Sequence, residues 1–364
     1  IGGPWASKWF AWSLAVRGFC LWCCRQVMTA SSTSSNHSES PLRLAMLGMI
    51  PGNGHPWSWS AIINGYDPGV MAAKCTYPGI IEYLAEQPLD EVRVPGARVT
   101  HLWTDVADEA PPIAEADFID RVVDRPEAVL GEVDAVILST DDGSDHVRRA
   151  RPFVEAGLPV FVDKPLADNL EDLAWFVAAR ERGARILSSS ALRYAPEVLE
   201  LRNRLGELGE LRWVSSFTAK TWERYGIHAL EAAYAVTGPG YRWVQTSGLE
   251  GGDVVTLGHA NSVSVTLPAI HDAYGSFGVI QACGTTGHES LHFTQTYAAF
   301  RAQLVAFIDA LKSGQDPFPF EQTIEQMLVI IAGRESRAQG GHRVEIADLR
   351  ERLEKRVVEM NADS

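Results

Sequence analysis

The sequence has few cysteines and no surplus of positive charge. Its five cysteines are too few and too scattered for a disulfide framework, and Cys75 and Cys283 have no metal-like spacing. Lysine and arginine number 32 against 46 acidic residues, and the net charge of −14 makes nucleic acid and anionic membranes poor partners. No internal repeat or metal-ligand pattern is visible. The composition favours a soluble, cytoplasmic protein, and 364 residues suffice for two domains.

The first 40 residues differ in composition from the rest. Residues 1–27 carry four tryptophans, three basic residues and no acid. Arg17 interrupts their apolar run, which is too short to span a membrane and lacks a signal-cleavage pattern. We interpret this stretch as a leader upstream of Met28, with membrane-surface contact as the second interpretation. Residues 29–40 predict a disordered polar linker, so the fold is expected to begin at residue 41.

Residues 132–165 contain the most informative pattern in the chain. An apolar, β-branched run at 133–138 predicts a strand that is buried on both faces. A helical pattern follows from Asp145 to Ala156, and residues 159–162 predict a second buried strand. Strand, helix and parallel strand form a βαβ unit, in which ligands gather beyond the carboxyl ends of the strands. The polar segments 139–146 and 163–165 therefore belong to one candidate site.

The first predicted strand covers residues 44–47, and a glycine-rich turn follows it at residues 48–55. Strand, glycine turn and helix at the start of a domain are typical of dinucleotide binding, although the spacing is G-x-x-x-G-x-G rather than G-x-G-x-x-G. Asp105 ends the strand predicted at 98–104 and is interpreted either as a ligand of the adenosine ribose or as a helix N-cap. The residues of the turn considered for the cofactor are Gly48, Gly52, Asn53, Gly54 and His55.

These motifs resemble those of the Gfo/Idh/MocA (glucose–fructose oxidoreductase / inositol dehydrogenase) family of nicotinamide-dependent oxidoreductases. The matched pieces span Leu42 to about Val344. The first match is the apolar strand at 133–138 with Thr140 after it and His146 further on. The second is the triplet Asp163-Lys164-Pro165, where the family has Glu-Lys-Pro. The others are the segment Tyr225 to Glu231, which contains His228, and the segments 307–314 and 332–336.

The resemblance implies an α/β fold of two domains. Residues 41–165 would form an N-terminal Rossmann domain with a doubly wound parallel sheet. Residues 166–364 would form an α+β domain that binds the substrate and carries a largely antiparallel open sheet. In the family such an open face is used for self-association, so a homodimer or homotetramer is expected.

The resemblance also implies the chemistry, which is hydride transfer between a nicotinamide and a secondary alcohol of a sugar, polyol or related compound. Lys164 would hold the alcohol oxygen and His228 would exchange its proton. The cofactor would be NAD or NADP, with NAD slightly favoured because Asp105 would repel a 2′-phosphate. The further cofactor residues implied are Thr140, His146, Asp163, Lys164 and Pro165.

One position departs from the family pattern. The family usually has an aspartate four residues before the histidine, and this chain has Arg224 there, which could favour an acidic or phosphorylated substrate or indicate altered chemistry. Two alternatives therefore stay open: a cofactor-retaining hidden-redox lyase or hydrolase, and a non-catalytic nucleotide- or sugar-binding sensor. The residues expected to bind the substrate are Lys164, Arg193, Tyr194, Arg224, Tyr225, His228 and Glu231.

Three other polar residues receive weaker expectations. His146 is expected either to lie over the cofactor or to cap the turn after the strand. Asp141 and Asp142 are expected to begin the following helix as N-cap residues, without a catalytic role.

Overall fold

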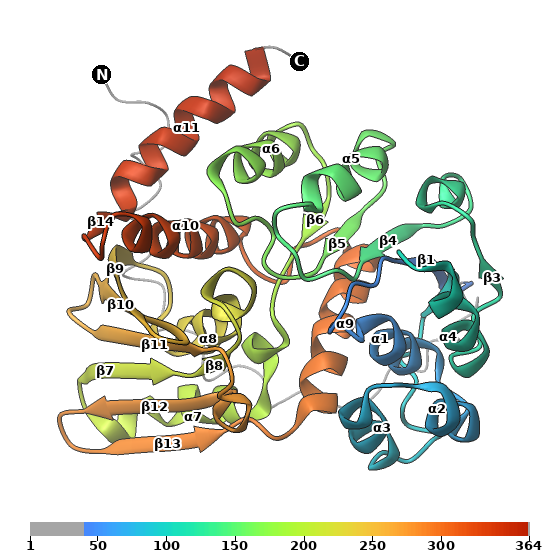
Figure 1. The fold of residues 1–364 in the computed structure, drawn as a ribbon, viewed down its shortest axis with the longest axis horizontal. Coiled ribbons are helices and arrows are strands. Elements are labelled where there is room, and N and C mark those ends of the chain that lie inside the picture. The colour runs from blue at the N-terminus through green and yellow to red at the C-terminus, as the bar shows by residue number, and fades with distance from the viewer. Residues whose placement is uncertain (1–39, 363–364) are drawn as a thin grey trace, which may run out of the picture. The chain divides into compact units, whose positions relative to one another are not determined.

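The computed structural model describes residues 40–362, and the leader and most of the linker considered above lie outside the described residues. Its first sheet is wholly parallel, in the order β3-β2-β1-β4-β5-β6 (Figure 1). The strands are β1 (Leu42–Leu47), β2 (Ala97–Trp103), β3 (Arg121–Val122), β4 (Ala135–Leu138), β5 (Val160–Val162) and β6 (Ile186–Leu187). The predicted Rossmann sheet is confirmed.

The alternation of side chains along β1 explains why helices cover both faces of this sheet. Leu44 and Met46 point into one apolar core, while Ala45 and Leu47 point into another. Because both cores exclude water, the strand must be apolar at every central position. The helices of this part of the chain are α1 (His55–Asn64), α2 (Pro68–Lys74), α3 (Pro78–Ala85), α4 (Ala110–Ala116), α5 (His146–Glu155) and α6 (Leu170–Glu181).

The second sheet is mixed, in the order β13-β12-β7-β11-β10-β9-β14, with β8 paired to β11. Only the pairings of β11 with β7 and with β8 are parallel. The expected second, largely antiparallel sheet is therefore confirmed. Its strands are β7 (Leu211–Ser216), β8 (Thr218–Ala219), β9 (Tyr241–Leu249), β10 (Gly252–His259), β11 (Ser264–Ile270), β12 (Val279–Gly284), β13 (His288–His292) and β14 (Val344–Glu345).

Helices α8 and α10 cover this second sheet, and the indole of Trp222 joins them. The indole Nε1 donates to the backbone oxygen of Ile330 at 3.0 Å. Gly226 and Gly333 lie against the same indole, so neither position has room for a side chain. The helices of this part are α7 (Pro196–Arg204), α8 (Trp222–Thr237), α9 (Thr296–Ser313), α10 (Phe320–Ala338) and α11 (Ile346–Ala362).

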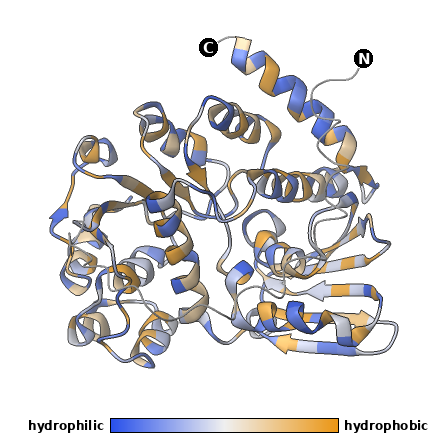
Figure 2. Cartoon of the chain, turned by 180° about the vertical axis from the view of Figure 1, so that it is seen from behind, coloured by the Kyte–Doolittle hydropathy of each residue, from blue (hydrophilic) through white to orange (hydrophobic). Residues whose placement is uncertain are grey.

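Two helices tie distant segments together. Helix α9 packs on α1, and its Phe307 contacts Phe161 of β5 with ring centroids 5.4 Å apart. Helix α11 mixes hydrophilic and hydrophobic residues, drawn blue and orange in Figure 2, and buries Ile346, Leu349, Leu353 and Val357. Within residues 40–362 no helix is long and apolar enough to cross a membrane.

Several boundaries differ from the sequence-based expectation. Strand β6 pairs with β5, so the first sheet extends past Pro165, where the domain boundary was expected. The stretch 67–97, which is rich in glycine and proline, contains α2 and α3, each begun by a proline in its first turn. Strand β9 and helix α7 were not predicted, and β9 was missed because Arg242, Gln245 and a glycine interrupt its apolar pattern.

Candidate active site

The loops that follow β1, β4 and β5 meet at the carboxyl edge of the parallel sheet. The Asn53 side-chain amide donates to the backbone oxygen of Ser139 at 3.0 Å, and the Ser139 hydroxyl donates to the backbone oxygen of Gly48 at 2.7 Å. The Asn53 amide also lies 3.4 Å from a carboxylate oxygen of Asp163. These bonds tie the glycine turn to both loops of the βαβ unit, so the structure brings together the segments that the sequence assigned to one site.

The glycine turn has the features that a dinucleotide needs. Gly48 has φ +98°, and a Cβ there would lie 2.7 Å from the Thr140 methyl group, so only glycine fits. Gly52 has φ +79° and is open on its outer side. Within residues 40–362 the N–H groups of Gly52 and Gly54 have no acceptor, and α1 begins directly after Gly54. Unpaired N–H groups at a helix start suit a pyrophosphate, so these residues fit the group.

Asp105 lies beside this turn, but its carboxylate already has two protein partners. It accepts from the Met49 N–H at 3.0 Å and forms an ion pair with Arg149 at 2.8 Å. Arg149 in turn pairs with Asp145 at 2.7 Å. Asp105 thus lies at the edge of the glycine turn, and the adjacent guanidinium offsets part of its charge.

Lys164 lies at the centre of the site and is only 2% exposed. Its ammonium is 3.5 Å from a carboxylate oxygen of Asp141 and 4.6 Å from the ring centroid of Tyr225. Burial alone would lower the pKa of this ammonium, but the carboxylates of Asp163 and Asp141 outweigh burial and raise the pKa. Lys164 is therefore a protonated donor at neutral pH, suited to stabilise negative charge on an oxygen.

Asp141 is the residue that sequence reasoning missed. It was expected to cap the following helix, but α5 begins at His146 with Asp145 at the N-cap position, and Asp142 instead accepts from Ser144. Burial tends to raise the pKa of the Asp141 carboxyl, but Lys164 and Arg224 overcome it and lower the pKa. The available signal was its position directly after Thr140, at the carboxyl end of β4.

Arg224 points across the site rather than into open space. Its guanidinium donates to Asp141 at 2.6 Å and to the backbone oxygen of Pro51 in the glycine turn at 3.2 Å. The carboxylate that the family pattern places at position 224 is therefore missing from α8, and a carboxylate from the β4 loop lies beside Lys164 instead. Because Arg224 is paired, it is not the uncompensated cation that its sequence position suggested.

His228 lies on α8, one turn after Arg224, and is 8% exposed. Its Nδ1 is 2.7 Å from the Ser190 hydroxyl, and no hydrogen bond joins its Nε2 to another residue of the described chain. Burial and the nearby Lys164 charge hold the pKa of this imidazole well below its ordinary value, so it is neutral at neutral pH. Its ring meets the Tyr225 ring edge-on at 4.8 Å. Lys164 and His228 therefore converge on the same tyrosine ring.

Glu231 and Arg193 are linked to His228 through Ser190. Glu231 forms an ion pair with Arg193 at 2.5 Å and accepts from the backbone N–H of Ser190 at 3.2 Å, which fixes the serine that contacts His228. Arg193 also donates to Gln322 at 2.8 Å. The adjacent Tyr194 is half-buried, and burial raises the pKa of its phenol to about 12.

His146 and His55 brace the loops on the cofactor side. The His146 ring is fully buried, with Nε2 2.8 Å from the Thr140 backbone oxygen and Nδ1 2.9 Å from that of Pro165. It links the two loops of the βαβ unit, which favours the capping interpretation of the two that were open. His55 pairs with Asp163 at 2.7 Å and stacks on Trp59 at 4.1 Å.

The described part of the chain contains no cluster of three or more side chains suited to hold a metal ion.

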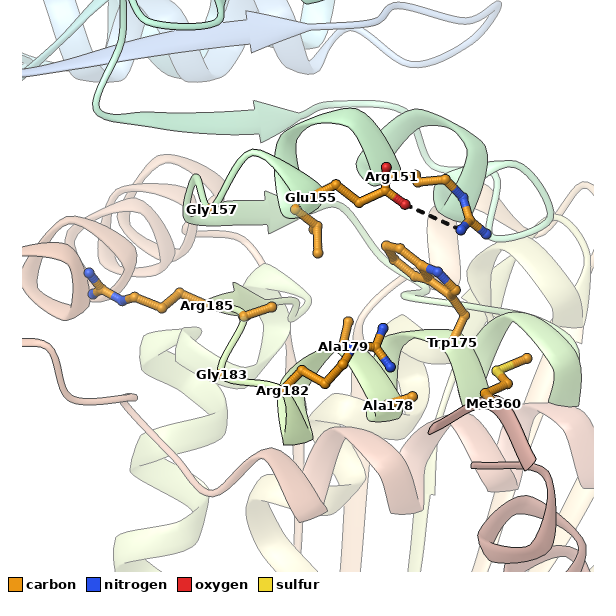
Figure 3. A pocket seen from close by; sticks show the side chains of 12 residues that line it. Arg151, Glu155, Gly157, Trp175, Ala178, Ala179, Arg182, Gly183, Arg185 and Met360 are labelled. Atoms are coloured by element: carbon orange, nitrogen blue, oxygen red, sulfur yellow. Dashed lines mark hydrogen bonds and ion pairs between the residues drawn. The ribbon is translucent and has the colours of Figure 1, made fainter. Parts of the chain in front are cut away.

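A cavity of about 560 Å³ lies elsewhere, between α5, α6 and the end of α11 (Figure 3). Its lining includes Gly157, Gly183 and Arg185, which precede β5 and β6, so it lies at the amino ends of these strands, opposite the site above. Arg151 lies over the Trp175 ring at 4.9 Å and pairs with Glu155 at 3.5 Å. Its walls hold none of the residues predicted for the site.

Comparison with known proteins supports the class suggested by fold and site. Residues 82–190 match the model of an "Oxidoreductase family, NAD-binding Rossmann fold", GFO_IDH_MocA. The "Putative UDP-kanosamine synthase oxidoreductase subunit" of Amycolatopsis mediterranei is 34% identical over 84 residues, which cover 23% of each chain. The "Putative oxidoreductase YceM" of Salmonella typhimurium is 34% identical over 111 residues, 30% of this chain and 36% of that protein. The chain thus aligns with about a quarter to a third of these relatives' length.

The similarity of fold extends much further than the similarity of sequence. The structure of scyllo-inositol dehydrogenase from Lactobacillus casei, with bound NAD(H) and scyllo-inositol, matches 85% of this chain and 100% of its own, with a TM-score of 0.66 and 13% identity. Both sheets of this chain therefore share the fold of that structure. The resemblance to the Gfo/Idh/MocA family predicted from the sequence is confirmed.

Proposed function

We propose that this chain is an oxidoreductase that transfers a hydride between NAD or NADP and a secondary alcohol of a sugar, polyol or related compound. The observation that carries the proposal is the convergence of the Lys164 ammonium and the His228 imidazole on Tyr225, at the carboxyl edge of a parallel sheet. The family match and a structural neighbour with NAD(H) and scyllo-inositol support it.

In this mechanism the two residues divide the work. The buried, protonated Lys164 donates to the alcohol oxygen and stabilises the negative charge that develops there. The neutral His228 takes the hydroxyl proton at Nε2, and in the reverse reaction it returns that proton. The nicotinamide, when bound, supplies the acceptor for the hydride that leaves the same carbon. Asp163 and Asp141 keep Lys164 charged, and Ser190 orients the imidazole.

The cofactor would be held by the glycine turn and the loops beside it. The N–H groups of Gly52 and Gly54 would bind the pyrophosphate, Asp105 the adenosine ribose, and Thr140 with Pro165 would line the nicotinamide side. NAD is slightly favoured over NADP because of Asp105. We also propose that the first sheet carries the cofactor, that the second carries the substrate and mediates a homodimer or homotetramer, and that the protein acts in the cytoplasm.

A direct assay tests this function against its alternatives. Purified protein is titrated with NADH and NADPH by fluorescence and then assayed for nicotinamide reduction against a panel of sugars and polyols. Reduction by one of these compounds is expected. Cofactor binding without net reduction would instead indicate a hidden-redox enzyme, and no cofactor binding would indicate a sensor.

A further inference from the structure

The charges around Tyr225 do not balance within the protein. Three cations lie there, Lys164, Arg224 and Lys220, and the Asp141 carboxylate pairs with the first two at 3.5 and 2.6 Å. The other carboxylate, Asp163, helps to raise the pKa of Lys164 and lies 2.7 Å from the His55 ring, so two carboxylates face three cations. Lys220 has no carboxylate partner among residues 40–362, and its ammonium donates to the Tyr225 hydroxyl at 2.7 Å. One ammonium at the site is therefore left without a counter-ion.

The position of Lys220 makes this imbalance informative. The residue is half-buried, directly follows β8 and precedes the N-cap of α8, and its ammonium lies 4.0 Å from the Tyr225 ring centroid. The same ring is contacted by Lys164 and by His228. Withdrawing an ammonium from water is unfavourable unless a partner compensates, and a cation–π contact with a phenol compensates only in part.

Lys220 also belongs to the second sheet rather than to the cofactor loops. Arg224 reaches the glycine turn through Pro51, so its charge faces the cofactor loops. Lys220 instead follows the β8 strand of the second sheet, and its backbone N–H bonds the His271 backbone oxygen at the end of β11. A molecule seated between Lys164 and His228 would therefore meet Lys220 with a group other than its reacting alcohol.

We infer that the substrate is a polyhydroxylated carboxylic acid, whose carboxylate pairs with Lys220 while its secondary alcohol lies between Lys164 and His228. This inference rests on the proposed function. A single ammonium beside a phenol hydroxyl matches one carboxylate, whereas a phosphate carries more charge and needs more donors. Because the chain as a whole carries a charge of −14, attraction of an acid requires such a local excess of cations.

Matched pairs of compounds test this inference. The full chain, saturated with NADH so that no oxidation occurs, is titrated calorimetrically with D-glucuronate and D-glucose, and with D-galacturonate and D-galactose. Each pair differs in one group, a carboxylate against a hydroxymethyl. At least one acid should bind more tightly than its neutral partner by about tenfold, the scale of one charge-assisted hydrogen bond.

Variants of Lys220 test whether this residue causes the preference for the acid. Lys220→Met keeps the length of the side chain and removes the charge, so the ratio of acid to neutral affinity should fall to about one. Lys220→Arg should retain the preference. Lys355→Met, on the exposed surface of α11, is the control and should leave the ratio unchanged.

The outcomes separate this inference from the proposed function, because binding is measured without turnover. If no acid binds more tightly than its neutral partner, or if Lys220→Met keeps the preference, the inference is wrong even when neutral sugars reduce the nicotinamide. If the preference depends on Lys220 but no compound reduces the nicotinamide, the acid site stands and the proposed function fails. If Lys220 instead strengthened the binding of glucose 6-phosphate relative to glucose, and not that of glucuronate, the choice of a carboxylate would be overturned.

Discussion

Arg224 donates to Asp141 at 2.6 Å and thereby joins helix α8 to the loop after β4. In the family pattern a carboxylate occupies the position of Arg224, on the same helix as the histidine. Here the positive charge lies on the helix and the negative charge on the opposite loop, 3.5 Å from the Lys164 ammonium. The site therefore keeps a carboxylate beside its lysine, although the chain lacks one at the usual position.

This pair should be energetically coupled. Asp141→Asn leaves Lys164 and Arg224 without their shared partner, and Arg224→Met leaves Asp141 with Lys164 alone. A double-mutant cycle on the free energy of unfolding, measured in urea, should give a coupling energy of about 1–3 kcal/mol. Additive effects of the two substitutions would show that the contact contributes nothing.

Sequence reasoning located this site but not its charge arrangement. The β-branched runs and the glycine turn predicted the parallel sheet, and the rule that ligands gather at carboxyl strand ends placed Thr140 and Lys164 in one site. Asp141 was read as a helix cap because its neighbours along the chain resemble capping sequences. Its actual partner, Arg224, is 83 residues away, and local sequence patterns contain no information on such a contact.

The neutral state of His228 leads to a prediction on pH. Because burial lowers its pKa in the folded chain, the acid limb of kcat/KM for alcohol oxidation should lie below pH 6.5. His228→Gln should abolish that limb and lower kcat by about 100-fold, measured with the substrate found in the panel.

The same shift affects stability. Below its ordinary pKa the unfolded chain binds a proton at His228 that the folded chain does not, so stability rises with pH and is lost as pH falls. His101, whose pKa burial also lowers, adds to this loss in the wild type and in the variant alike. Between about pH 7.5 and pH 5.5, His228→Gln should therefore lose less stability in urea than the wild type. An equal loss in both would contradict a buried neutral imidazole.

The ion pair between Asp105 and Arg149 should control the choice of cofactor. Asp105→Ser removes the carboxylate and leaves Arg149 available to a 2′-phosphate, so the affinity ratio should shift towards NADP by about tenfold or more. The shift is measured by titration with NADH and NADPH. Arg149→Met is the matched variant and should shift the ratio towards NAD. A ratio that neither substitution alters would remove the pair from cofactor selection.

The packing of Trp222 between two helical glycines leads to a prediction on stability. A Cβ at Gly333 would collide with the indole that bonds Ile330, so Gly333→Ala should destabilise the fold by about 1–3 kcal/mol. Gly314, the left-handed cap of α9, is open on its outer side, which makes Gly314→Ala a control whose cost comes from backbone strain alone, about 1 kcal/mol. Chemical denaturation measures both. A smaller loss for Gly333→Ala than for Gly314→Ala would contradict close packing at Trp222.

Other parts of the fold could not be predicted because tertiary contacts override local patterns. Strand β9 is interrupted by polar residues, yet it pairs with β10 on one side and with β14 on the other. Helices α2 and α3 lie in a stretch rich in proline and glycine, where Asp67 caps the first helix by accepting from Gly69 and Val70. The hydrogen bonds of β9 come from distant strands that its periodicity does not reveal, whereas the cap of α2 is local and was overlooked among the prolines and glycines.

Reduction of the nicotinamide by Lys164→Ala, compared with the wild type, tests the account most directly. Absorbance of the reduced nicotinamide is followed with the substrate from the panel, and fluorescence titration verifies that the variant still binds the cofactor. The account predicts that kcat falls by at least about 100-fold while the folded state and cofactor binding persist. Turnover at the wild-type rate would show that this buried ammonium takes no part in the reaction.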